Sequence, residues 1–137
     1  MFTNIMVPVD LAHVDSLDRT ITIACDMAKV YSSSLHFVAV TGSGPGPAAR
    51  NPEEFTEKLQ ALAAKWASQS GINIDAKTIV SNDVAVELDA SLRHACDELG
   101  ADLVIVGSHV PGFADYVVRS HGGSLASHAK VSVLVVR

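Results

Sequence analysis

The sequence has no long apolar run, no basic segment and few cysteines. A membrane-spanning helix needs roughly 20 apolar residues, so we expect no transmembrane segment and no membrane partner. Ten Lys and Arg stand against fifteen Asp and Glu, giving a net charge of −5, so we expect no nucleic-acid partner. The N-terminus lacks a charged region followed by an apolar one, which favours a cytoplasmic protein without a signal peptide.

Several common catalytic and metal-binding motifs are also absent. The chain has no P-loop, no Gly-x-Ser-x-Gly elbow, no His-Glu-x-x-His and no Cys-x-x-Cys, which excludes the enzymes and zinc sites that depend on them. Cys25 and Cys96 fall on apolar faces of expected helices and are interpreted as core residues. His109 and His121 are either a metal-binding pair or two solvated loop histidines. We assign no metal ligand and no catalytic residue.

What the chain does contain is a regular alternation of strand-like and helix-like segments. Apolar residues make up 48% of the sequence. Strands are expected at 4–10, 35–40, 72–80, 103–106 and 131–136, and helices from Asp15 and Ser16 to about Tyr31, from Asn51 to Gly71, from Asn82 and Asp83 to Gly100, and over about 120–130. This order predicts a parallel, three-layered α/β fold, and the length fits one domain over residues 1–137.

Two of these segments carry further detail. Asn51 should cap the second helix, with Pro52 in its first turn. The third strand, from Ile72 to Val80, alternates Ile72, Ile74, Ala76, Thr78 and Val80 with polar neighbours, which predicts a strand partly exposed at the sheet edge.

The segment 41–50 is rich in glycine and proline. Gly42, Gly44 and Gly46 superficially match a dinucleotide-binding fingerprint, but Pro47 follows and no helix opens there. We interpret the segment as a mobile surface loop and not as a cofactor loop.

Candidate ligand-binding residues fall where strands end. Ligands of parallel sheets bind beyond the carboxyl ends of the strands, where Asp10, Val40 and Gly107 are expected. Asp10 is either a helix cap or a ligand contact. A glycine at a strand end lets a ligand approach the backbone, and a helix that opens at Ser120 offers N–H groups to an anion.

Three stretches, 5–10, 83–109 and 128–137, together resemble the universal stress protein family over essentially the whole chain. The resemblance implies a Rossmann-like, five-stranded parallel sheet of order 3-2-1-4-5 with helices on both faces. ATP-binding members carry two glycines after the fourth strand and a third, followed by Ser or Thr, where the next helix opens.

The glycine pattern is only partly kept here. Gly107 matches the first glycine, Val110 takes the place of the second, and we assign Arg119 and Ser120 to the final pair. The alternative pair at 123 and 124 would lengthen the loop by four residues and shorten the last helix to under two turns.

The resemblance implies an ATP or ADP site, with Mg²⁺ held through the phosphates. Residues near the adenosine would come from the first two strands, and those near the phosphates from the last third of the chain. The assigned residues are Pro8, Val9, Asp10, Val40, Val106, Gly107, His109, Arg119, Ser120, His121 and Gly122. Arg119 adds a cation that could fold inward onto a phosphate.

Three functions follow as hypotheses. The first is a nucleotide-binding stress-response module that forms a homodimer through the edge strand 131–136. The second is a dimeric interaction scaffold that binds no nucleotide, because Val110 and Arg119 replace glycines. The third is a slow ATPase or autokinase, which has the least support because no general base is evident.

Overall fold

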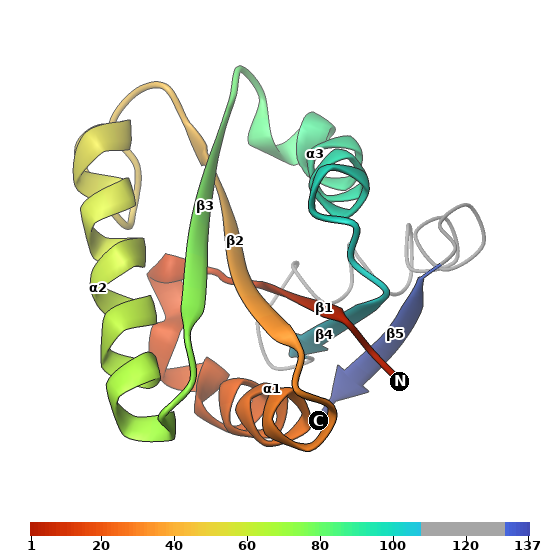
Figure 1. The fold of residues 1–137 in the computed structure, drawn as a ribbon. Helices are drawn as coiled ribbons and strands as arrows, with labels where there is room; N and C mark the ends of the chain where they lie inside the picture. Colours follow the sequence, from red (N-terminus) through yellow and green to blue (C-terminus); the bar gives the residue numbers. More distant parts are fainter. Residues whose placement is uncertain (108–130) are drawn as a thin grey trace.

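The computed structural model describes residues 1–107 and 131–137, and it contains a five-stranded parallel sheet of order β3-β2-β1-β4-β5 (Figure 1). The expected α/β fold and strand order are confirmed. In chain order the elements are β1 (Asn4–Pro8), the 3-10 helix η1 (Leu11–Leu17), α1 (Asp18–Tyr31), β2 (Ser34–Gly42), α2 (Pro52–Ser70), β3 (Ile74–Ser81), α3 (Val84–Leu99), β4 (Leu103–Gly107) and β5 (Ser132–Val136). The helix expected at 120–130 lies outside the described residues.

Figure 1 shows α1 and α2 on one face of the sheet and α3 on the other, and an apolar core lies on each face. The α1/α2-side core joins Ile21 of α1 and Leu59 of α2 to Phe37 of β2, all fully buried. The α3-side core joins Leu92 of α3 to Met6 of β1. Burying each large apolar side chain contributes roughly 1.5–3 kcal/mol, so these contacts fix the helices on the sheet faces.

The ends of α2 and α3 form as expected. The side chain of Asn51 accepts the N–H of Glu54 at 2.8 Å, and that of Asp83 accepts the N–H of Val86 at 3.3 Å. Gly71 and Gly100 end these helices with φ of +75° and +61°, a region that favours glycine.

The start of the first helical segment differs from the expectation. Asp10, and not Asp15 or Ser16, supplies the cap, and it begins η1 ahead of α1. The residue before α1, Leu17, makes no side-chain cap bond. The expected cap at Asp15 and Ser16 is therefore wrong: the chain enters α1 directly from η1, and the Oγ of Ser16 donates to the carbonyl of His13 instead of capping the helix.

The strand ends also differ in detail. β1 stops at Pro8, two residues early, whereas β2 continues to Gly42. β3 is a partly exposed edge strand as expected: Val80 near its end is 51% exposed, and Ile79 on the other face packs against the α3-side core. Ile74 and Ala76 pack against the α1/α2-side core, so β3 keeps a regular alternation and contributes to both cores.

Pro8 shapes the carboxyl edge of the sheet. The N–H of Val9 donates to the carbonyl of Val38 in β2, so Pro8, one residue earlier, faces β4. Proline has no N–H to donate, and the pairing of β1 with β4 covers only Ile5 and Met6. As a result, β1 and β4 are not paired with each other at their carboxyl ends, although each remains paired there with its other neighbour, β2 or β5.

Candidate functional site

A cavity of about 480 Å³ lies at the carboxyl ends of β1 and β2. One wall is the chain that follows β1, from Val9 to Ala12. The end of β2 and the loop after it, from Val40 to Ala49, form a second wall, and the start of α3 closes the third side. The volume falls within the range of small-molecule sites, and parallel sheets bind ligands at this edge.

Asp10 has both carboxylate oxygens engaged at the rim of this cavity. Its Oδ1 accepts the N–H of Ala12 at 3.0 Å, and its Oδ2 lies 2.9 Å from the Nδ1 of His13. The side chain of Asp10 is about one-quarter exposed, and each carboxylate oxygen has a further lone pair for a donor. Asp10 is therefore a helix cap that keeps acceptor capacity towards the cavity.

The main chain of Val40 is the second polar feature. The pairing of β2 with β1 ends at Val38, whose carbonyl accepts from Val9 at 2.8 Å. Alternate residues of a strand face the same neighbour, so the N–H and C=O of Val40 face the side that β1 has left. Among the described residues, no backbone bond to Val40 is present on that side. A donor and an acceptor therefore lie side by side at the cavity.

The predicted site residues divide into three groups. Val9, Asp10 and Val40 line the cavity. Pro8, Val106 and Gly107 lie at the same edge, at the ends of β1 and β4, but do not line it. The other five, His109, Arg119, Ser120, His121 and Gly122, lie outside the described residues, as does Val110.

Sequence reasoning missed a whole wall of the cavity. The segment that we interpreted as a surface loop is mostly exposed, as expected, yet Gly42, Gly44 and Gly46 line the cavity. Asn82, just before α3, also lines it, together with Leu88. The sequence did carry a usable signal. The glycine loop comes at the end of β2 and Asn82 at the end of β3, and both strand ends belong to the carboxyl edge of the sheet.

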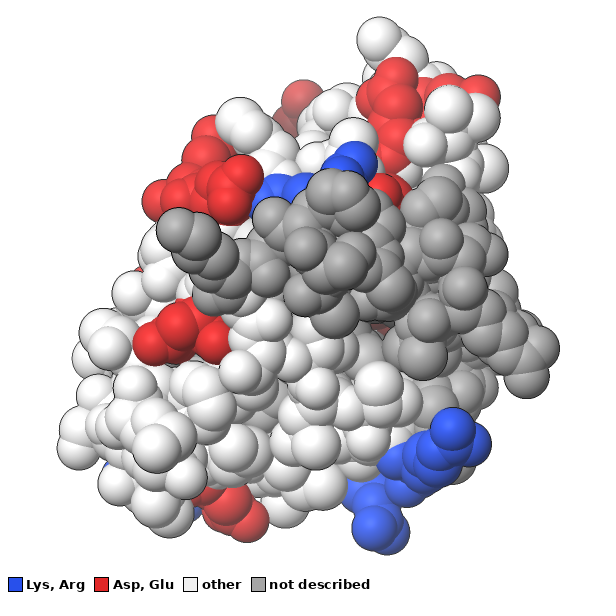
Figure 2. All heavy atoms as spheres, turned by 90° about the vertical axis from the view of Figure 1, so that its right-hand side faces the viewer, with Lys and Arg blue, Asp and Glu red and all other residues white. Residues whose placement is uncertain are grey.

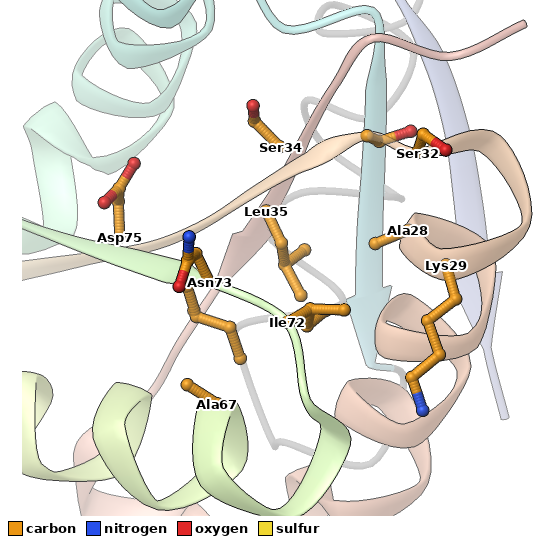
Figure 3. Close-up of a pocket in the computed structure, with 11 residues that line it drawn as sticks. Ala28, Lys29, Ser32, Ser34, Leu35, Ala67, Ile72, Asn73 and Asp75 are labelled. Atoms are coloured by element: carbon orange, nitrogen blue, oxygen red, sulfur yellow. The ribbon is translucent and has the colours of Figure 1, made fainter.

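A larger cavity, of about 800 Å³, lies at the opposite end of the sheet (Figure 3). It lies where α1 and α2 end and where β2 and β3 begin, and many of its lining residues are exposed. The side chains of Lys29 and Asp75 point away from each other, and Leu35 lies between them (Figure 3). Because no set of polar groups converges there, its greater volume does not make it the better site.

The described part of the chain has no cluster suited to metal chemistry or thiol chemistry. Within residues 1–107 and 131–137, no three His, Cys, Asp or Glu side chains group to hold a metal ion. Burial raises the pKa of Cys96 to about 11 and also raises the pKa of Cys25. Both cysteines are buried as expected, and both are protonated near neutral pH.

No helix in the described ranges is long and apolar enough to cross a membrane.

Comparisons with a family model and with a curated protein point to the same family. The family model of the universal stress protein family matches residues 1–137. Universal stress protein G of Escherichia coli O157:H7 is 28% identical over 146 residues, which covers 100% of both chains.

Two solved structures from Archaeoglobus fulgidus have the same fold. A universal stress protein superimposes with a TM-score of 0.71 at 18% identity, covering 100% of both chains. A universal stress protein in complex with dAMP superimposes with a TM-score of 0.67 at 17% identity, covering 98% of each chain. The family match over the full length and the shared strand order agree, and the chain belongs to the universal stress protein family.

Proposed function

We propose that this chain is a stress-response module that binds an adenine nucleotide in the cavity at the ends of β1 and β2. The observation that carries the proposal is the main-chain donor and acceptor of Val40, which no residue of the described ranges bonds on the β1 side, in the same cavity as the carboxylate of Asp10. A neighbouring donor and acceptor match the edge of adenine, whose amino group donates while the adjacent ring nitrogen accepts.

The charge in the cavity favours the nucleoside part of the ligand over its phosphates. Asp10 is the one charged side chain among the described residues that line the cavity. A carboxylate accepts hydrogen bonds from ribose hydroxyls but repels phosphates. We therefore expect the ribose near Asp10, and the phosphates towards Gly107 and the residues that the sequence assigned to them. The nucleotide would be ATP or ADP, with Mg²⁺ held by its phosphates.

The comparisons support the ligand class. The Archaeoglobus fulgidus protein bound to dAMP has the same fold and aligns with nearly the whole of this chain. Its ligand contains adenine and a deoxyribose, which are the parts that the described cavity suits. That the ligand of this chain has two or three phosphates, as ADP or ATP, is part of the proposal.

The proposed assembly is a cytoplasmic homodimer joined through β5. This strand lies at the edge of the sheet that the described residues form, and it pairs there with β4 alone, from Ser132 to Val136. Figure 2 views the molecule from the β5 side and shows a broad uncharged area between separate acidic and basic groups. An apolar strand with a free edge is suited to pair with its own copy.

The test of the nucleotide is its recovery from the purified protein. The protein is denatured, and the released small molecules are identified by mass spectrometry; near-stoichiometric adenine nucleotide is expected. A preparation without nucleotide should show a rise in Tm on adding AMP, ADP or ATP. Neither nucleotide nor a shift in Tm would instead favour the interaction scaffold that binds no nucleotide.

A further inference from the structure

Three glycines that line the cavity have no structural reason to be glycine. Neither Gly42, Gly44 nor Gly46 lies in the left-handed region of φ. A Cβ built on any of them would meet no atom within 4 Å. An alanine at each position would therefore fit the ligand-free protein without strain.

The other glycines of the described chain differ in this respect. Gly71 and Gly100 have positive φ and end helices. At Gly107, a Cβ would lie 2.8 Å from the Oγ1 of Thr20. The fold therefore accounts for glycine at these three positions, but it does not account for the three glycines along the cavity wall.

Gly42 is the most informative of the three. It is the last residue of β2 and pairs with Ser81 of β3, so its backbone is held in the sheet. By strand alternation it lies on the same face as Val40, which packs against the α3-side core. On that face the start of α3 lines the cavity with Val84 and Leu88. The space in front of Gly42 is therefore part of the cavity.

The loop beyond Gly42 is anchored at its far end. The N–H of Gly46 donates to the carbonyl of Ala49 at 2.9 Å, and the Nζ of Lys58 in α2 donates to the carbonyl of Ala48. Ala49 itself is buried in the α1/α2-side core. These contacts hold the glycine backbone beside the cavity.

We infer that the bare backbone of Gly42, extended by Gly44 and Gly46, is a contact surface for the nucleoside part of the ligand. The missing side chain of Gly42 leaves the space that the base enters when its edge bonds the main chain of Val40. This inference rests on the proposed function. The glycine backbone would form one wall of the site and would favour a flat group that can approach it closely.

The experiment measures binding of AMP and of adenosine by calorimetry for the natural chain, Gly42→Ala and Gly42→Val. We expect the alanine variant to bind both ligands more weakly and the valine variant to lose at least about tenfold in affinity for each. The losses should be equal for AMP and adenosine, because the contact is with the nucleoside. Tm without ligand should be unchanged or raised, because valine suits a strand better than glycine.

Gly71→Ala is the matched control. Its positive φ predicts a lower Tm, and its distance from the cavity predicts unchanged affinity. If the natural chain binds AMP and the Gly42 variants bind as tightly, the inference is wrong while the proposed function stands. A loss for AMP without a loss for adenosine would also overturn the inference. If the natural chain binds no adenine nucleotide, the proposed function fails first.

Discussion

The Oγ1 of Thr20 lies 2.8 Å from the point where an alanine at position 107 would place its Cβ. Thr20 is in the first turn of α1 and is fully buried, and Gly107 ends β4. The Cδ2 of Leu17 would lie 3.6 Å from the same point. The contact between α1 and the end of β4 therefore requires glycine at 107, independently of any ligand that the resemblance to the family assigned to it.

The first prediction concerns this contact. Gly107→Ala should lower the free energy of unfolding by about 1–3 kcal/mol, because the added methyl group overpacks a buried site. Thr20→Ala removes the Oγ1, so Gly107→Ala should cost clearly less in that background. Thr20→Val keeps a similar shape and should not relieve the clash. Urea unfolding of the single and double variants measures this coupling, and additive effects of Gly107→Ala and Thr20→Ala would contradict it.

Much of this fold could be predicted because its signals are local. Asn51 and Asp83 precede apolar periodic segments, and Gly71 and Gly100 follow them, so the ends of α2 and α3 were readable from capping chemistry alone. Val40 was placed at the cavity because a strand's carboxyl end can be located from its apolar run.

Other features depend on contacts between distant segments. Asp10 caps η1, and α1 then begins without a side-chain cap, so the division of the first helical segment depends on the path of the chain after β1. The glycine loop was separated from the site because its spacing fails a sequence fingerprint. Its place on the cavity wall follows from the position of β2 beside β1.

The second prediction concerns the dimer. The N–H of Ser132 donates to Asp102 on the β4 side, so by alternation the N–H of Val133 faces the outer edge of the sheet. Val133→Pro removes that outward donor without removing a bond to β4. We expect the variant to remain folded and to sediment mainly as a monomer at micromolar concentration.

Leu134→Pro is the control, because its N–H faces β4 and its loss should lower Tm strongly. A charged residue at 133 would be a poorer test, since Val133 also packs against the α3-side core. A natural chain that is monomeric, or a Val133→Pro protein that remains a stable dimer, would disprove assembly through this edge.

The third prediction concerns alkaline pH. Burial, with a smaller contribution from Asp97, raises the pKa of Cys96 from 9.0 to about 11. The stability that this shift contributes is fully present below about pH 9 and is lost as pH rises towards about 11, because the unfolded chain releases the proton first. The loss is on the order of 2 kcal/mol. Cys96→Ala should flatten the pH dependence of unfolding, whereas parallel curves would rule out this role of Cys96.

The fourth prediction concerns Arg119, which the sequence alone assigns to the phosphates. In a chain of net charge −5, a local cation is needed to hold a polyanion. Arg119→Ala should weaken ATP more than adenosine, by about 1–3 kcal/mol. Calorimetry that gives equal losses for the two ligands, or tighter ATP binding in the variant, would mean that Arg119 does not contact the phosphates.

The most direct measurement of the central claim compares AMP with inosine monophosphate by calorimetry on the nucleotide-free protein. The two ligands share the ribose and the phosphate but differ at the base edge that the main chain of Val40 would bond. Inosine places an acceptor where adenine has a donor, opposite the carbonyl of Val40. The proposed site predicts that AMP binds at least about tenfold more tightly. Equal affinities, or no binding of AMP at all, would contradict it.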